Sequence, residues 1–423
     1  MRVNFQPSRC EGTVTVPPSK SMAHRTLICA ALAEGESIIE NLAFSQDIEA
    51  TIRGLCAFGA RVERLGDSTV RVHGMGWPKA PAEPIDCGES GSTLRFFIPL
   101  AALVGQPVRF VGHGRLMERP QNVYEEIFAQ KGVHFSHTAE EIVVDGTLPA
   151  GEYRVDGSVS SQFITGLLLA LPLCEGESRI ALTTPLQSAG YVDMTMETMA
   201  RFGVRVETAP DGWRIPGGQR YRPHDETVEA DWSQAAFLLA AGALGGEVVL
   251  SGLDPRSTQG DREALALFRR FGADIRETGE GLLCRRAPLH GIDIDASQIP
   301  DLVPILAVTA ALAEGTTRIT GAARLRLKES DRLAAVTHCL RLLGGRVEEH
   351  PDGLTIEGRS LLPGGAEVPG YNDHRIVMSM AVAALGCDKP VTITGAGCVQ
   401  KSWPAFFTDF QQIGGNVHGV EYR

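Results

Sequence analysis

Apolar segments of helical length recur along the chain, and each ends near a glycine that leads into an alternating, strand-like segment. The first, "TLICAALA" (26–33), runs to Gly35. Glycine commonly ends a helix, and alternation of apolar and polar residues predicts a strand. Six glycines close such segments at intervals of 69–71 residues: Gly35, Gly105, Gly176, Gly246, Gly315 and Gly386.

A second series of glycines follows the first in the same order. Each closes a further helical segment and opens an alternating strand, as in "FGARVE" at Gly59 and "FGVRVE" at Gly203, and the intervals are 69–73 residues. Each repeat of about 70 residues is therefore predicted to contain a helix, a strand, a second helix and a second strand, followed by one or more further strands. A repeat of this size cannot bury its apolar faces alone, so the six copies must pack together. Two groups of three are the natural partition.

The boundary between the two groups is predicted at 217–231, a polar and irregular segment after the third repeat. The first strand, "VNFQPS" (3–8), precedes the first helix, and we expect it to pair with the C-terminal half. The predicted domains are therefore 1–15 with 230–423, completed by the N-terminal strand, and 20–225. The chain would cross between them near 14–20 and near 223–231.

Composition narrows the class of protein. The chain of 423 residues is 43% hydrophobic and 6% aromatic, and its net charge of −11 argues against a nucleic-acid-binding scaffold. The N-terminal segment has no signal-peptide pattern, and no apolar run approaches the roughly 20 residues of a membrane span. We therefore expect a cytoplasmic protein, or an organellar one that has lost its transit peptide, with no membrane partner. The nine cysteines form no CxxC pair, and no P-loop, GxGxxG or HExxH motif occurs. We therefore expect no metal and no cofactor.

Polar clusters stand at the predicted start of the first helix of each repeat. A serine, aspartate or asparagine there can be a simple N-cap. N-caps do not explain Lys20, Arg25, Arg95 and Arg375, because positive charge opposes the dipole at a helix start. A bound anion would resolve the conflict, since helix starts with nearby lysine or arginine are anion sites. If the six helix starts of both domains face one cleft, that cleft suits small, highly anionic ligands.

Further charged clusters fit this interpretation. A glycine-rich loop carries Arg119, "LKESDR" (327–332) carries Lys328, Glu329 and Arg332, and Lys401 occupies the corresponding region of the last repeat. Asp301 and Glu329 are the carboxylates placed beside the basic clusters, and such a pair suits proton transfer.

Taken together, these motifs resemble those of the enolpyruvyl transferase family along essentially the whole chain. The resemblance rests on "PPSKSMAHR", "GESGSTLR", "RLMERP", "SSQ", "PD", "LKESDR", "NDHR" and "KSWP". It implies an α/β (α+β) fold of two domains, each of three βαβαββ repeat units with inward-packed helices. It also implies transfer of the enolpyruvyl group of phosphoenolpyruvate to the 5-hydroxyl of shikimate 3-phosphate, a step of aromatic amino acid biosynthesis. The hydroxyl attacks C2, C3 is protonated, and phosphate leaves from a tetrahedral intermediate.

The resemblance also assigns roles to residues of this chain. Shikimate 3-phosphate would contact Lys20, Ser21, Arg25, Ser160, Ser161, Gln162, Ser188, Asp301 and Lys328. Phosphoenolpyruvate would contact Lys20, Gly91, Arg119, Gln162, Arg332, Arg375 and Lys401. The catalytic residues would be Asp301, Glu329 and Lys20, with Asp301 as base; whether Glu329 or Lys20 protonates C3 stays open.

Charge arithmetic agrees with two anionic substrates. Two phosphates and two carboxylates bring roughly −5 to −6. With the two carboxylates Asp301 and Glu329, seven cations give the site a net charge of +5: Lys20, Arg25, Arg119, Lys328, Arg332, Arg375 and Lys401. This balance predicts an open ligand-free form that closes on binding.

The alternative within the family is the branch that acts on UDP-N-acetylglucosamine. Its reactive cysteine has no counterpart in "GHGRLMERP" (112–120), and the Lys-Asn pair of that branch is Lys20-Ser21 here. In the main interpretation the partners are the two small substrates alone, and we expect a monomer.

Overall fold

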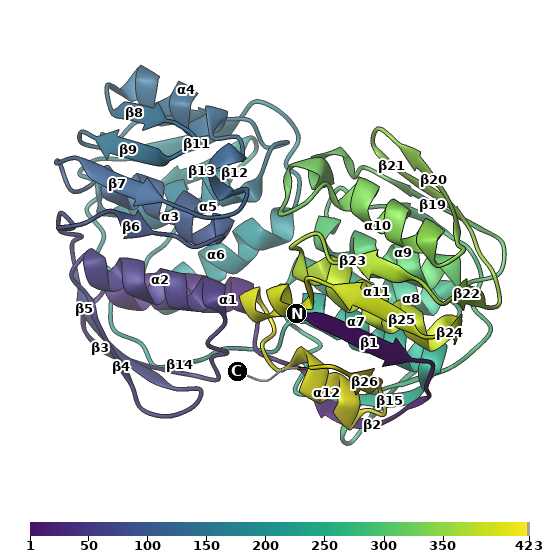
Figure 1. Cartoon of the computed structure of the whole chain (residues 1–423). Coiled ribbons are helices and arrows are strands. Elements are labelled where there is room, and N and C mark those ends of the chain that lie inside the picture. Colours follow the sequence, from purple (N-terminus) through teal and green to yellow (C-terminus); the bar gives the residue numbers. More distant parts are fainter. Residues whose placement is uncertain (421–423) are drawn as a thin grey trace. The chain divides into compact units, whose positions relative to one another are not determined.

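The computed structural model describes residues 1–420 and divides the chain into two compact units. Unit 1 comprises Met1–Ser19 and Glu229–Arg423, and unit 2 comprises Lys20–Val228. The chain therefore passes from one unit to the other after Ser19 and again after Val228 (Figure 1). Each unit mixes many short strands and helices, which confirms the predicted α/β fold class.

The described strands are short, and they alternate with helices in both units. Those of unit 2 are β3 (Glu34–Glu40), β4 (Arg61–Arg64), β5 (Val70–Met75), β6 (Ile85–Asp86), β7 (Val108–Val111), β8 (His134–His137), β9 (Glu141–Asp145), β10 (Glu152–Val155), β11 (Ser178–Leu182), β12 (Glu207–Ala209), β13 (Gly212–Ile215) and β14 (Glu226–Thr227). Those of unit 1 are β1 (Arg2–Gln6), β2 (Cys10–Thr15), β15 (Gly246–Ser251), β16 (Asp274–Thr278), β17 (Gly281–Arg285), β18 (Asp293–Asp295), β19 (Thr316–Thr320), β20 (Arg346–His350), β21 (Gly353–Glu357), β22 (Leu362–Gly364), β23 (Glu367–Pro369), β24 (Cys387–Lys389), β25 (Val391–Thr394) and β26 (Asn416–His418).

The helices lie between these strands, six in the described part of each unit. Those of unit 2 are α1 (Lys20–Leu32), α2 (Gln46–Ala57), α3 (Gly91–Ala101), α4 (Asn122–Lys131), α5 (Ser161–Ala170) and α6 (Ala189–Arg201). Those of unit 1 are α7 (Trp232–Gly245), α8 (Glu263–Phe271), α9 (Val303–Ala311), α10 (Arg332–Leu342), α11 (His374–Ala383) and α12 (Phe406–Gln412).

Six four-stranded sheets within residues 1–420 share one plan. In each sheet two strands pair in parallel, one of them pairs antiparallel with a third strand, and the third pairs antiparallel with a fourth. Three sheets use consecutive strands: β6-β7-β9-β8, β10-β11-β13-β12 and β18-β19-β21-β20. Each of these segments has the order strand, helix, strand, helix, strand, strand, which is the predicted repeat.

The other three sheets borrow a strand from far along the sequence. β2 pairs in parallel with β15, and β14 pairs in parallel with β3. β1 pairs antiparallel with both β25 and β26, with Val3 opposite Ile393 and Phe5 opposite Val417 (Figure 1). The N-terminal segment thus supplies strands to two sheets of unit 1, and the segment before Val228 supplies one to unit 2.

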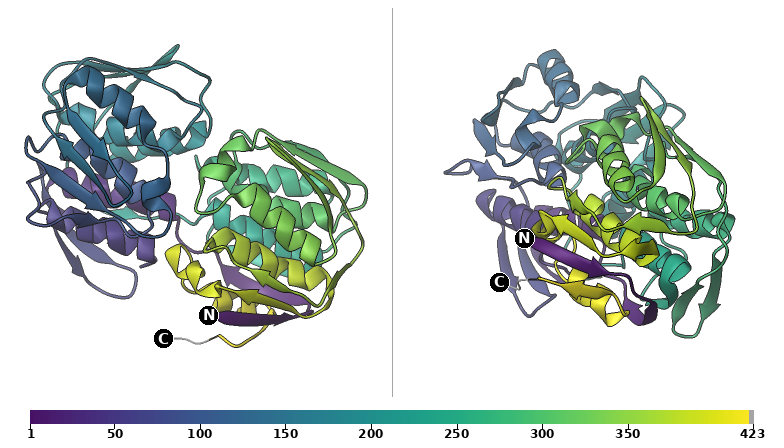
Figure 2. Two further views of the ribbon diagram at one scale, coloured as in Figure 1. Left: turned by 45° about the horizontal axis from the view of Figure 1, so that its top comes forward. Right: turned by 45° about the vertical axis from the view of Figure 1, so that its right-hand side comes forward.

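Each unit is built around three helices whose side chains are almost all buried. They are α1, α3 and α5 in unit 2, and α7, α9 and α11 in unit 1. A helix that is apolar on every side belongs inside a core rather than at a surface, and Figure 2 shows the helices of each unit lying side by side with strands at the periphery. Separate apolar cores therefore fill the two units, and the starts of the central helices carry the polar clusters noted above.

Candidate active site

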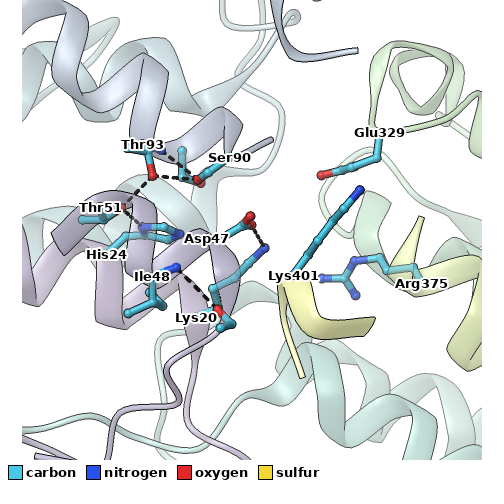
Figure 3. Close-up of polar contacts among 12 residues, drawn as sticks. Lys20, His24, Asp47, Ile48, Thr51, Ser90, Thr93, Glu329, Arg375 and Lys401 are labelled. Atoms are coloured by element: carbon cyan, nitrogen blue, oxygen red, sulfur yellow. Dashed lines mark hydrogen bonds and ion pairs between the residues drawn. The ribbon is translucent and has the colours of Figure 1, made fainter. Parts of the chain in front are cut away.

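The start of α1 receives a carboxylate from another helix. α1 has no acid in its own first turn, but Lys20 Nζ lies 2.5 Å from Asp47 Oδ2 (Figure 3). Asp47 stands in the first turn of α2, where Ser45 caps the helix by accepting a hydrogen bond from the Ile48 N–H. The protein therefore supplies part of the negative charge that the sequence analysis assigned to a ligand. Acids are common in the first turn of a helix, so the position of Asp47 in the sequence did not indicate that it pairs with Lys20.

Arg25 is buried beneath the same helix start. Its Nη1 donates to the Ser21 carbonyl oxygen at 2.7 Å, and its Nε donates to Thr195 Oγ1 at 2.8 Å. Its Nη2 donates to the Tyr191 carbonyl oxygen at 2.9 Å, so the guanidinium ties α1 to α6. Burial lowers the pKa of Arg25 to about 10, and the side chain stays a cation at neutral pH.

Gly91, Arg119 and Gln162 come together at the start of α3. A Cβ built on Gly91 would lie 2.8 Å from Arg119 Nη1 and 3.6 Å from Gln162 Oε1. The absence of a side chain at Gly91 therefore leaves room for the Arg119 guanidinium beside the start of α3, which Ser90 caps. A buried cation beside a helix start is an arrangement that favours an anion.

The side chain of Gln162 is held in place from two sides. Arg95 Nη1 donates to Gln162 Oε1 at 2.9 Å, and Gln162 Nε2 donates to Ser92 Oγ at 3.0 Å. Arg95 Nη2 also donates to the Pro120 carbonyl oxygen at 3.0 Å, next to Arg119. The basic residue Arg95, which was predicted to be one of the anion-binding cations at the helix starts, thus supports the loop and Gln162.

Three predicted serines stand at the starts of α5 and α6. Ser160 caps α5, with its Oγ accepting from the Gln162 N–H at 3.3 Å, and Ser161 is the buried first residue of the helix. Ser188 precedes α6 in the left-handed conformation (φ 57°, ψ 47°) and is buried. Such a backbone costs of order 1 kcal/mol for a non-glycine residue and clusters at functional sites. A hydrogen bond of 3.0 Å from the Gln187 N–H to the Gly157 carbonyl oxygen ties the two segments together.

In unit 1, Arg332 is the centre of a cluster of carboxylates. Its guanidinium bonds Asp373 Oδ2, Asp301 Oδ1 and Glu329 Oε2, each at 2.8 Å. Burial alone would lower the pKa of Arg332, but the charges of Asp373, Glu329 and Asp301 outweigh it and raise the pKa. Arg332 therefore organises the carboxylates of this cluster as well as adding a charge to it.

Asp301 is surrounded by cations. Besides Arg332, its carboxylate lies 3.1 Å from Arg375 Nη2 and 3.6 Å from Lys328 Nζ. Burial would raise the pKa of Asp301, but Arg375, Lys328 and Arg332 together hold it well below its ordinary value. The carboxylate is therefore ionised and is a hydrogen-bond acceptor at neutral pH.

The pKa of Lys328 moves the other way. Burial lowers it, with Arg332 adding to the effect and Asp301 opposing it. Lowering the pKa of a lysine makes it a better partner for proton exchange near neutral pH.

The start of α11 adds a fully buried acid to this cluster. Asp373 caps α11 by accepting from the Arg375 N–H at 3.0 Å while it pairs with Arg332. Just before it, Asn372 has φ 52°, and its carbonyl oxygen accepts from Lys401 Nζ at 2.8 Å. Figure 3 shows Glu329, Arg375 and Lys401 among the side chains of this region. The motif "NDHR" gave no indication of this ion pair, because an aspartate in that place is typical of an ordinary N-cap.

Asp261 is a third acid that the sequence did not reveal, after Asp47 and Asp373. It is 3% exposed and precedes α8. Burial, helped by the charge of Asp301, raises the pKa of Asp261 to about 6, although Arg375 opposes the shift. Its only signal in the sequence is an acid before a helix, in "QGDRE".

The predicted residues therefore form two sets, one in each unit. Unit 2 holds Lys20, Ser21, Arg25, Gly91, Arg119, Ser160, Ser161, Gln162 and Ser188, and unit 1 holds Asp301, Lys328, Glu329, Arg332, Arg375 and Lys401. Within residues 1–420, no cluster of three His, Cys, Asp or Glu side chains could hold a metal ion. Over the same residues, no helix is long and apolar enough to cross a membrane.

Comparison with known proteins identifies the family. The model of the EPSP synthase (3-phosphoshikimate 1-carboxyvinyltransferase) family matches residues 5–410. The chain belongs to the EPSP synthase family. A 3-phosphoshikimate 1-carboxyvinyltransferase of Clostridium acetobutylicum is 45% identical over 98% of both chains, and one of Clostridium perfringens is 44% identical over 99% of both.

Solved structures agree with this membership. An EPSP synthase from Acinetobacter baumannii is 27% identical, with a TM-score of 0.81, over 99% of this chain and 100% of that one. The enolpyruvyl transferase NikO from Streptomyces tendae is 20% identical, with a TM-score of 0.78, over 99% of this chain and 98% of that one, and shares the fold. The predicted family resemblance is confirmed, and these relatives give no support to the UDP-N-acetylglucosamine alternative.

Proposed function

We propose that the chain transfers the enolpyruvyl group of phosphoenolpyruvate to the 5-hydroxyl of shikimate 3-phosphate, releasing phosphate. The observation that carries the proposal is membership of the EPSP synthase family over residues 5–410, with relatives named 3-phosphoshikimate 1-carboxyvinyltransferase at 45% identity. Both substrates carry a phosphate and a carboxylate, and the basic helix starts of both units are suited to bind such anionic groups.

For shikimate 3-phosphate, we propose that the serine-bearing starts of α5 and α6 bind the phosphate through Ser160, Ser161 and Ser188. Hydroxyls and free helix-start amides together suit a phosphate dianion. Ser21 and Arg25 would hold the carboxylate of this substrate, and Gln162 would lie beside its ring. The strained backbone of Ser188 supports this assignment, since strain of this kind persists where function requires it.

For phosphoenolpyruvate, we propose contacts with Lys20, Gln162 and the helix start formed by Gly91 and Arg119. In unit 1, the proposed contacts are Arg332, Arg375 and Lys401. The close approach of Arg119 to Gly91 supports this assignment in unit 2. The hydrogen bonds of Arg332 to three carboxylates assign it a second role, which is to hold Asp301 and Glu329 in place.

We propose Asp301 as the base for the shikimate hydroxyl, alongside Lys328. In the ligand-free protein, three cations keep Asp301 a weak base. Anionic substrates that engage these cations would weaken their hold on the carboxylate and raise its proton affinity. Each substrate would engage part of this set of cations, so the base strength of Asp301 would be greatest when both substrates are present. Glu329 and Lys20 remain the two candidates for protonation of C3.

The two additional acids revise the charge balance. Asp47 and Asp373 pair with Lys20 and Arg332, so seven cations and four carboxylates give a net charge of +3 rather than +5. The substrates bring roughly −5 to −6. Burial, with the charge of Asp301, raises the pKa of Asp261 to about 6, so this neighbouring acid takes up a proton more readily than an ordinary aspartate.

The test of the function is release of inorganic phosphate from phosphoenolpyruvate by the purified chain. Phosphate should appear with shikimate 3-phosphate and not with UDP-N-acetylglucosamine. Phosphate release with UDP-N-acetylglucosamine, and none with shikimate 3-phosphate, would overturn the proposal. We further propose that the enzyme is cytoplasmic and acts as a monomer. A dimer in gel filtration would contradict the monomeric state.

A further inference from the structure

A buried line of hydrogen bonds joins the N-terminal halves of three helices in unit 2. His24 Nδ1 lies 2.7 Å from Thr51 Oγ1, and Thr51 Oγ1 lies 2.6 Å from Thr93 Oγ1. Thr93 Oγ1 donates to Ser90 Oγ at 2.8 Å. Figure 3 shows these four side chains and the contacts between them. All four are at most 1% exposed. The line runs from α1 through α2 to the cap of α3, beside Gly91.

The direction of each hydrogen bond follows from counting hydrogens. Ser90 Oγ accepts twice from Thr93, from its backbone N–H at 3.1 Å and from its hydroxyl. The single hydroxyl hydrogen of Thr93 is then committed, so Thr51 must donate to Thr93. The hydrogen of Thr51 is committed in turn, so His24 Nδ1 must carry a hydrogen and donate to Thr51.

The surroundings of His24 exclude a second hydrogen on its ring. In the described part of the chain, Nε2 has no hydrogen-bond partner, and the ring lies edge-on to Phe96 with centroids 6.4 Å apart. The charged groups around it are Lys20 and Arg25 on α1, with Asp47 of α2 bound to Lys20. Burial and these two cations hold the pKa of His24 well below its ordinary value.

We propose that His24 is a positioning residue that, as the neutral Nδ1–H tautomer, fixes the direction of this line and turns the remaining Ser90 hydrogen toward phosphoenolpyruvate. The two hydrogen bonds that Ser90 Oγ accepts leave its own hydrogen available for donation. With the line reversed, Ser90 would donate to Thr93 and present a lone pair, which repels an anion at the start of α3. The identity of the anion rests on the proposed function, whereas the tautomer does not.

The tautomer is tested directly by nitrogen-15 NMR of histidine-labelled protein, with the His24 signals assigned by their loss in His24→Asn. His24 should show a protonated Nδ1 and an unprotonated Nε2, unchanged between pH 5 and pH 8. A protonated Nε2, or titration of the ring near pH 6.5, would overturn the inference. This measurement needs no substrate, so it stands even if the proposed function fails.

The consequence for binding is tested with two matched pairs of variants. The amide nitrogen of His24→Asn reaches the place of Nδ1 and keeps the donor, whereas His24→Leu removes it; Thr51→Ser keeps the hydroxyl, whereas Thr51→Val removes it. His24→Leu and Thr51→Val should raise the KM for phosphoenolpyruvate about tenfold, the effect expected for one lost hydrogen bond to an anion. His24→Asn and Thr51→Ser should stay within about threefold of the parent.

The KM for shikimate 3-phosphate is the internal control and should stay unchanged in all four variants. Equal losses within each pair, or a loss confined to shikimate 3-phosphate, would overturn the positioning role. If His24→Leu does not fold, the Thr51 pair and the NMR measurement still decide the question. Failure of the proposed function would appear differently, as a parent protein that releases no phosphate with shikimate 3-phosphate.

Discussion

Asp373→Asn should lower the free energy of unfolding markedly, because Asp373 belongs to the buried carboxylate cluster of unit 1. Asp373 is 0% exposed and accepts from Arg332 Nε at 2.8 Å and from Ser330 Oγ at 3.0 Å. Removing one partner of a buried ion pair costs about 3–5 kcal/mol. Because Arg332 keeps Asp301 and Glu329 as partners, we expect the lower end, about 3 kcal/mol. Urea unfolding followed by circular dichroism measures this loss.

Asp331→Asn is the matched control, because Asp331 also caps a helix and pairs with an arginine. It accepts from the Ala334 N–H at 3.0 Å and lies 2.9 Å from Arg326, but its side chain is 35% exposed. Asparagine is as good a cap as aspartate, and exposed pairs contribute little, so the control should lose at most about 1 kcal/mol. Equal losses of unfolding free energy in the two variants would refute the argument from buried charge.

Three further predictions concern the proposed site. Gly91→Ala should raise the KM for phosphoenolpyruvate about tenfold, because its Cβ would lie 2.8 Å from Arg119 Nη1 and displace the guanidinium; a change only in the KM for shikimate 3-phosphate would contradict this. Asp301→Asn should slow turnover by at least about 10²-fold in steady-state kinetics, and a loss below tenfold would remove Asp301 from the catalytic role. Burial and the charge of Asp301 raise the pKa of Asp261 to about 6, so the native state holds the carboxyl proton of Asp261 more tightly than the unfolded chain does. The contribution of Asp261 to stability therefore falls as the pH rises from about 4 to about 6. Asp261→Asn should therefore gain about 2–3 kcal/mol of unfolding free energy relative to the parent between pH 4 and pH 7, and a constant difference would contradict the assignment.

The repeat and the fold class could be predicted because both depend on short-range patterns. Glycines at nearly constant spacing, apolar runs and alternating strands all lie within about 70 residues of one another. The two-residue strand β14 carried too little pattern to be predicted, and its partner β3 lies 187 residues away in sequence. Pairings of that kind depend on the closed fold and not on local propensity.

In the candidate site, too, some residues could be predicted from the sequence and others could not. Basic residues such as Lys20 and Arg375 could be recognised, because positive charge at a helix start violates a local rule. Asp47, Asp373 and Asp261 obey the local rules for acids before helices, so their pairing with site cations stayed hidden. The tautomer of His24 likewise depends on hydroxyls that α2 and α3 bring to it, and no spacing in the sequence reveals that contact.

The central claim is that this chain moves an enolpyruvyl group from phosphoenolpyruvate to shikimate 3-phosphate. Phosphorus-31 NMR of the purified protein with both substrates tests it most directly. The account predicts that both substrate signals fall together while inorganic phosphate and one new phosphate monoester rise in equal amounts. Loss of phosphoenolpyruvate without a new monoester, or an unchanged spectrum, would contradict it.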